Sequence, residues 1–125
     1  MQEILGVSVL SLLDPAGRDT TANGSAVDIL NYEGQAAAIL QSAAGTGTDP
    51  TLDVKLQDSA DGSTDWQDIT GAVFTQITDA AVSTEVIKFN ASAVRRFVRA
   101  VATIGGTTPS FICAASFVGK KQIIP

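Results

Sequence analysis

The amino-acid sequence predicts an all-β fold, one antiparallel sandwich or barrel of eight or nine short strands. Apolar and polar residues alternate along several segments, as in strands with one buried face. Turn-forming residues interrupt the chain about every ten residues, which is the strand spacing of sandwiches and barrels. A length of 125 residues with 45% hydrophobic residues suits a single domain, residues 1–125, with one continuous core.

The clearest predicted strand covers residues 51–58. Successive side chains of a strand point to opposite faces, so this segment separates its apolar from its polar side chains. The apolar set is Leu52, Val54 and Leu56, and the polar set is Asp53, Lys55 and Gln57. This pattern is typical of a half-buried antiparallel strand.

Other segments are predicted strands because they are rich in β-branched, aromatic or small apolar residues. They are residues 4–13, 25–32, 35–42, 65–70, 73–78, 86–89, 96–103 and 109–119. In the last segment, alternation places four apolar side chains on one face: Phe111, Cys113, Ala115 and Phe117.

Two segments also have the composition of helices. Residues 34–44 are rich in alanine, which favours helix, but they lack the wide polar face of an exposed helix. We therefore predict a strand there. For residues 90–96 we predict a single helical turn at a corner of the sheet.

The predicted turns contain Gly, Pro, Asn and Asp, which supply positive φ angles or a preset φ. They are residues 14–17, 22–24, 45–50, 61–62 and 105–106. The two consecutive glycines at residues 105–106 predict a hairpin that joins a strand over 94–104 to a strand over 109–119.

The composition argues against an enzyme. The chain has no histidine, so it lacks the side chain best suited to proton transfer near neutral pH. One cysteine, Cys113, excludes an intrachain disulfide and a zinc site of the Cys/His kind. Residues 58–65 superficially resemble a calcium loop, but the ligand spacing of an EF-hand is missing. We predict no catalytic residue, no metal and no cofactor.

Charge is distributed unevenly along the chain. Residues 1–87 contain all thirteen acids and two bases, which gives −11, and residues 88–125 contain six bases and no acid, which gives +6. One interpretation is that the basic C-terminal strands lie beside acidic strands and neutralise them. The other is a dipolar surface suited to repeated or lattice contacts between copies.

Nucleic-acid and membrane partners are not expected. The net charge is −5, and only 6% of residues are aromatic, whereas single-stranded nucleic acid is bound on basic surfaces with several exposed aromatic rings. Apolar runs are too short to span a membrane, and the first residues lack the basic start of a signal peptide. The sequence therefore predicts a protein that is made and used in the cytoplasm, or one that is delivered without a cleaved export signal.

Three motifs resemble those of small virion proteins of tailed bacteriophages. Residues 57–66 match Gln-x-Ser-x-Asp-Gly-x-x-x-Trp, and residues 96–99 match Arg-Phe/Tyr-Val-Arg. Residues 25–30 are similar to the Ser-x-x-Ile-Asp-Leu strand of head cement, or decoration, proteins. The resemblance spans residues 20–119. Discoidin-like carbohydrate-binding sandwiches also use similar Ser-x-Asp-Gly-x-x-Trp and Arg-Tyr-Val-Arg motifs, but this chain lacks their cysteine pair and has few aromatic residues for a sugar.

The resemblance implies a jelly-roll or β-sandwich of about eight strands that acts as a capsid cement protein. The implied partners are the major capsid protein lattice and copies of the chain itself, in a homo-oligomer on the capsid surface of a virion assembled in the host cytoplasm. A discoidin-like carbohydrate- or host-surface-binding module and a head–tail or tail connector component are the alternatives. Residues 1–3 and 120–125 are candidate contact arms. The candidate interface residues are Trp66, Arg95, Arg96, Arg99, Lys120, Lys121, Ile123 and Ile124.

Overall fold

The computed structural model describes residues 7–121, and nearly all of this range is extended chain. Its helical element is one short 3-10 turn, η1 (Ala91–Ala93). The strands are β1 (Val7–Arg18), β2 (Ala22–Asn23), β3 (Val27–Asp28), β4 (Tyr32–Ser42), β5 (Thr46–Ser59), β6 (Gln67–Val73), β7 (Ser83–Asn90) and β8 (Phe97–Lys121). The all-β prediction of about eight strands is confirmed.

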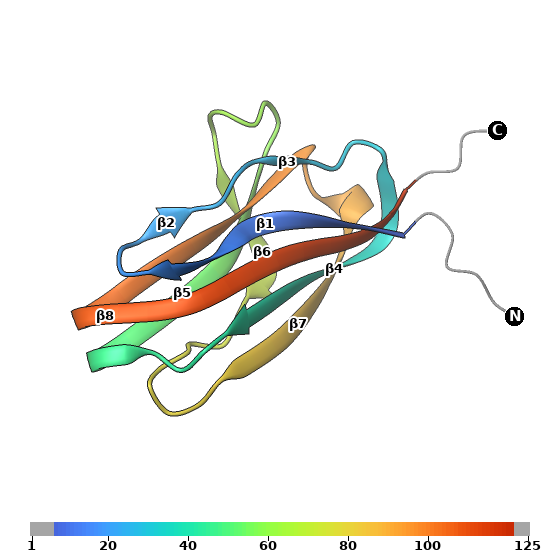
Figure 1. Cartoon of the computed structure of the whole chain (residues 1–125). Helices are drawn as coiled ribbons and strands as arrows, with labels where there is room; N and C mark the ends of the chain where they lie inside the picture. The colour runs from blue at the N-terminus through green and yellow to red at the C-terminus, as the bar shows by residue number, and fades with distance from the viewer. Residues whose placement is uncertain (1–6, 122–125) are drawn as a thin grey trace, which may run out of the picture.

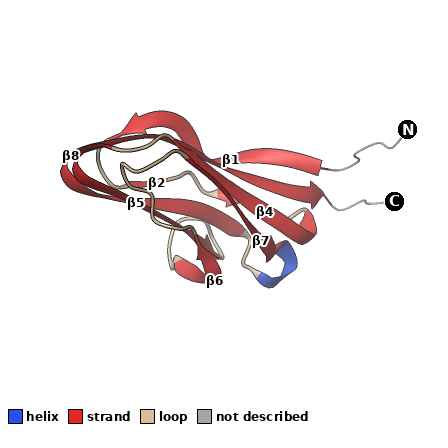
Figure 2. Ribbon diagram, turned by 90° about the horizontal axis from the view of Figure 1, so that it is seen from below, coloured by secondary structure: helices blue, strands red, loops and turns tan. Residues whose placement is uncertain are grey.

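The strands form a β-sandwich of two antiparallel sheets that share β8 (Figures 1 and 2). Sheet A contains β1, the C-terminal half of β8, β4 and β7, side by side in that order. Sheet B contains β2 and β3 at one edge, then the N-terminal half of β8, β5 and β6. The side chains between the two sheets form one hydrophobic cluster.

β8 and the two strands that pair with it along its length, β5 and then β4, form one long ribbon that runs through both sheets. β8 pairs with β5 over residues 97–110 and with β4 over residues 113–121. The ribbon bends back on itself where β8 passes from sheet B to sheet A (Figure 1). The predicted hairpin at residues 105–106 is therefore wrong. The chain does change direction there, but the segments on either side pair with β4 and β5 and not with each other.

Glycines allow the two strands of the ribbon to bend together. Gly47 in β5 and Gly106 in β8 have φ angles of 106° and 111°. A Cβ on Gly47 would lie 2.4 Å from the carbonyl oxygen of Thr108, and one on Gly106 would lie 2.7 Å from that of Asp49. Only glycine fits at so close an approach. Residues 45–50, predicted as a turn, thus belong to this corner.

Three further predictions need correction. Residues 14–17 do not end a strand, because β1 continues through them and accommodates the extra residues by shifts of register around Leu13 and Ala16. Bulges of this kind are common on edge strands, where they disturb the row of free backbone groups. Within residues 25–32 the strand residues are the two of β3 and Tyr32, where β4 begins. Of residues 73–78 only Val73 belongs to a strand, with a single bridge from Ile77 to Leu52.

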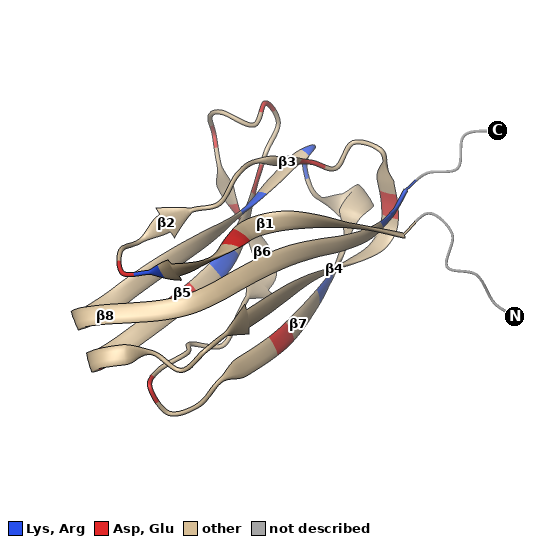
Figure 3. Cartoon of the chain, viewed as in Figure 1, with Lys and Arg blue, Asp and Glu red and all other residues tan. Residues whose placement is uncertain are grey.

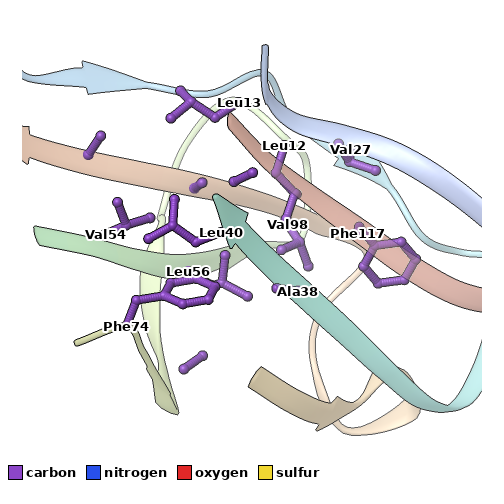
Figure 4. Packing of buried hydrophobic residues seen from close by; sticks show 14 of the residues in the cluster. Leu12, Leu13, Val27, Ala38, Leu40, Val54, Leu56, Phe74, Val98 and Phe117 are labelled. Carbon is purple, nitrogen blue, oxygen red and sulfur yellow. The ribbon is translucent and has the colours of Figure 1, made fainter. Parts of the chain in front are cut away.

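The predicted inward faces are confirmed, and they build the core between the sheets (Figure 4). The side chains of both predicted sets are buried: Leu52, Val54 and Leu56 from β5, and Phe111, Cys113, Ala115 and Phe117 from β8. The Phe117 ring lies 5.1 Å from the ring of Tyr32, edge to face, and 5.9 Å from the ring of Phe89. Close packing of this kind fixes how the two sheets sit on one another.

The two helix-like segments also behave as predicted. Residues 35–42 lie in β4, with alternate side chains buried. η1 forms the helical turn at the corner after β7, where the Asn90 side chain accepts a hydrogen bond from the Ser92 amide at 2.9 Å. No helix in residues 7–121 has the length and hydrophobicity needed to span a membrane.

Candidate functional site

The outer face of sheet A consists mainly of small and aliphatic side chains. The residues that point outward here are called the sheet A face. They are Val7, Val9 and Ser11 of β1, Ala37, Ile39 and Gln41 of β4, Thr84, Val86 and Lys88 of β7, and Ile112, Ala114, Ser116 and Val118 of β8. A sheet face in water usually carries polar side chains, whereas here only Lys88 is charged.

Cross-strand pairing brings these side chains into contiguous rows. Val9 lies opposite Val118, which lies opposite Ala37 on its other side. In the next row Ser116 lies opposite Ile39, which lies opposite Val86. Outward side chains in register on adjacent strands are neighbours, so the apolar atoms form one patch.

The most exposed members of the patch lie at its two ends and its centre. The exposed fraction is 67% for Ile112, 65% for Val9 and 53% for Val86. Val82, just before β7, is 76% exposed and lies beside the end of the patch near Ile112. An exposed valine is ordinary by itself, but several on one face with a single charged residue indicate a contact surface.

The sheet A face has a shallow hollow at each end. One, of about 300 Å³, is lined by Pro15, Gln41, Val82 and Ile112 among others. The other, of about 330 Å³, is lined by Val7, Ala37, Lys88, Val118 and Lys120 among others. Hollows of this kind accept side chains that project from a partner.

Charged residues border the face at its ends (Figure 3). Lys88 and Lys120 lie at the end where Glu33 pairs with Lys120 across the strands. The other end is bordered by Asp14 in the bulge of β1 and by Asp79 in the loop before β7, both exposed. Within residues 7–121 the salt bridges use Lys55, Arg95 and Arg96, and none involves these border residues.

The outer face of sheet B differs, because its polar side chains bind one another. The polar residues of this sheet B face are Asp53, Lys55, Gln57, Asp68, Arg99 and Thr103, with Trp66 and Gln76 at its margin, and the face also carries Val73 and Val101. Lys55 forms a salt bridge of 3.0 Å with Asp68, which also accepts a hydrogen bond from the Gln57 amide. These bonds lower the pKa of the Asp68 carboxyl.

The predicted interface arginines all bind groups of their own chain. Arg95 donates from Nε to Asp58 at 3.0 Å and from Nη1 to Asp65 at 3.1 Å. Arg96 forms two hydrogen bonds, of 2.8 and 3.1 Å, with the Asp28 carboxylate. This contact, with the Leu30 amide, lowers the pKa of Asp28.

Arg99 and Trp66 form a pair. The Arg99 guanidinium donates two hydrogen bonds to the Gln57 side-chain oxygen and lies 4.3 Å from the centre of the Trp66 ring. A cation over an aromatic ring is a stabilising contact, and it occupies one face of the indole. The structure thus supports the interpretation in which basic C-terminal residues neutralise acidic neighbours. Whether these residues also contact a partner stays a prediction.

The remaining predicted residues divide between described and undescribed chain. Lys120 and Lys121 are exposed at the end of β8. Ile123 and Ile124 lie outside the described residues, as do residues 1–3. Val7 pairs with Lys120, so β1 begins beside the end of β8.

The loop that suggested a calcium site is held by its own hydrogen bonds. The Asp61 carboxylate accepts from the amides of Ser63 and Thr64 at 2.9 and 2.8 Å and from the Thr64 hydroxyl. These bonds lower the pKa of Asp61 strongly. The buried Ser59 hydroxyl donates to the Thr64 carbonyl oxygen. Within the described residues, no group of three or more acids or cysteines is arranged to hold a metal.

A polar cleft of about 550 Å³ separates β6 from β7 and η1. Its lining includes Asp58, Asp68, Lys88, Asn90 and Arg95. Three of these side chains, Asp58, Asp68 and Arg95, already have charged partners in the chain, and Asn90 caps η1.

The single cysteine, Cys113, is buried in the core, and burial raises the pKa of its thiol.

The sheet A face was not predicted from the sequence. A signal was present, because the outward positions in residues 35–42 and 109–119 carry no charge and include Ala37, Ile39, Ile112, Ala114 and Val118. A strand that is apolar on both sides predicts burial of both sides, which here holds for only one.

Comparisons with known proteins give no family for this chain. No family model matches it, and no curated protein does. A solved structure described as "Bacillus endospore appendages form a novel family of disulfide-linked pili" is similar over 98% of both chains, with 13% identity and a TM-score of 0.41. A likeness of this strength carries no argument about function.

Proposed function

We propose that this chain is a non-catalytic structural protein of a protein shell, and specifically a cement protein of a bacteriophage head. The observation that carries the proposal is the sheet A face. Exposed apolar patches of this kind cover protein contacts in assembled states, because burying them removes apolar surface from water.

The rest of the molecule suits a scaffold. The bent ribbon of β4, β5 and β8 continues through both sheets, and the arginines tie β8 and its flanks to acidic residues of distant segments. The bulged edge strand β1, with Pro15, discourages uncontrolled strand pairing. A rigid subunit loses little conformational entropy when it binds, so more of each contact stabilises the shell.

Cement action follows from mass action. A protein that binds assembled capsid subunits and not free ones stabilises the assembled state, and many copies multiply a weak contact. In this proposal the capsid is contacted at the end of the sandwich where Val7 pairs with Lys120, next to the exposed Lys121.

The test is co-sedimentation of the purified chain with empty heads of its phage. We expect saturable binding with many copies per head, and a higher temperature of head rupture when the protein is bound. Lys120→Glu with Lys121→Glu should weaken binding, and the control Lys55→Glu, on the sheet B face, should not. If the heads sedimented without bound protein at every protein concentration, the result would contradict the proposal.

The carbohydrate alternative would place a sugar in the polar cleft between β6 and β7, since its lining offers amide, carboxylate and guanidinium groups. A glycan array probed with the purified chain separates the two functions. Specific glycan binding that is lost in Asn90→Ala would favour the alternative, and an array without signal would favour the structural role.

A further inference from the structure

We infer that the sheet A face binds the same face of a second copy of this chain, with the strands of the two copies running in opposite directions. The two copies would be related by a two-fold axis that lies in the interface, across the strands, near the row of Ser116. The inference rests on the proposal that this face is a docking surface, but not on which shell the protein joins.

The size of the face suits a weak dimer. Four strands about 4.8 Å apart, with about seven residues each, cover about 450 Å². Two such faces in contact, with the added surface of their projecting side chains, bury on the order of 1,000 Å² of accessible surface in total, which is the lower limit for a specific interface. We therefore expect a dissociation constant on the order of 10–100 μM.

The composition of the face suits a copy of itself. An apolar face gains most from an apolar partner, and a two-fold arrangement places each central residue against its own counterpart. On the proposed axis Ile39, Val86 and Ser116 would each face the same residue of the other copy. Stacked sheets lie about 10 Å apart, which leaves room for these side chains to interdigitate.

The border charges select the direction of stacking. Lys88 and Lys120 lie at one end of the face with Glu33, and Asp14 and Asp79 border the other end with Arg18, which donates to the Asp14 carbonyl oxygen, so the first end is net basic and the second net acidic. Reversal of the strands brings the basic end of each copy over the acidic end of its partner. Lys88 then faces Thr84 of the other copy, at the end of β7 that leads to the loop with Asp79, and Lys120 lies over the end that carries Ile112 and Asp14.

The alternative two-fold axis, along the strands, is less favourable. It keeps the ends of the two copies aligned and places β1 over β7. Asp14 of one copy would then approach Asp79 of the other, and like charges across an interface repel. The apolar rows permit either arrangement, and the charges at the ends favour the antiparallel one.

Sedimentation velocity of the isolated chain over a range of concentrations, without heads, tests the inference. We expect a monomer–dimer equilibrium for the wild type. Val86→Glu should weaken the dimer at least about 100-fold, because it buries paired carboxylates. Its matched control is Val73→Glu, an equally exposed valine on β6 of sheet B, opposite Lys55, which should leave dimerisation unchanged.

Charge reversal tests the orientation. Lys88→Glu and Asp79→Lys should each weaken the dimer about threefold at low ionic strength, because the two ends attract without a direct ion pair, and the double variant should recover most of the loss. Additive losses in the double variant would contradict the antiparallel arrangement. A wild type that is monomeric up to about 1 mM, or a dimer that survives Val86→Glu, would overturn the inference. Head binding without a dimer would overturn the inference and leave the proposed function standing. A dimer without head binding would support the inference and contradict the proposed function.

Discussion

The outer faces of the two sheets share one strand, β8, and yet differ in chemistry. On sheet A, β8 presents Ile112, Ala114, Ser116 and Val118 outward, next to other small or aliphatic side chains. On sheet B the same strand presents Arg99, which binds Gln57 and Trp66. The sheet A face therefore leaves aliphatic side chains in contact with water, whereas the polar side chains of the sheet B face bind one another.

The difference shows where a partner can act. Polar groups that already bind one another gain little from a new contact, because each must first give up an existing bond. Exposed aliphatic side chains have no such bonds to lose, and their burial is favourable. For this reason we expect the site residues predicted from charge, such as Arg95 and Arg96, to stabilise the fold, and the sheet A face to be the better candidate for the proposed contact with a partner.

The largest effect should come from a charge on the sheet A face. Val9→Glu should abolish self-association, at least about a 100-fold loss, because the carboxylate would be buried beside the Asp14 region of β1 in the other copy. Val9 is 65% exposed in the single chain, so the melting temperature of the chain should hardly change. Leu30→Glu, at a comparably exposed site outside this face, is the control. Equal losses from both variants, measured by sedimentation, would remove the distinction between the faces.

The next effect concerns the polar side. Arg95→Ala should lower the free energy of unfolding by about 2 kcal/mol, because Asp58, only 14% exposed, loses its ion pair. Lys55→Ala breaks the more exposed pair with Asp68 and should cost less than about 0.5 kcal/mol. Urea unfolding of both variants checks the order. If Lys55→Ala cost as much as Arg95→Ala, burial would not govern these pairs.

A smaller effect is the pH dependence of the loop after β5. The folded chain lowers the pKa of Asp61, so this carboxylate stabilises the fold above its unfolded pKa, about 4, and the stabilisation is lost as the pH falls through the folded pKa. Wild type should therefore lose more stability between pH 7 and pH 3 than Asp61→Asn. Urea midpoints at the two pH values measure this. Equal losses of stability in the wild type and in Asp61→Asn would show that the hydrogen bonds of Asp61 are not linked to folding.

The sequence predicted the parts of the fold that depend on local alternation. Leu52, Val54 and Leu56 face inward as their period of two requires. The pairing of β8 was not predictable in the same way, because glycines at residues 105–106 indicate a change of direction without naming the strand that lies alongside. A hairpin and a bent ribbon have the same local signal.

The candidate site was hidden for a related reason. Ala37, Ile39, Ala114 and Val118 are as apolar as buried residues, and nothing in the chain order shows that their side of the strand stays uncovered. Asp58 and Asp28, which bind Arg95 and Arg96, lie 37 and 68 residues away from them in the sequence. Counting charges along the chain does not show which acid pairs with which arginine over such separations. Only the folded arrangement assigns these side chains.

The most direct test of the docking face is a dilution series followed residue by residue in amide NMR spectra. Between about 1 mM and about 20 μM, we expect shifts confined to the outward residues of β1, β4, β7 and the second half of β8, with Ile39, Val86 and Ser116 among the largest. Amides of Lys55, Gln57 and Arg99 should not move. Shifts centred on those three residues, or no shifts at all, would contradict the account.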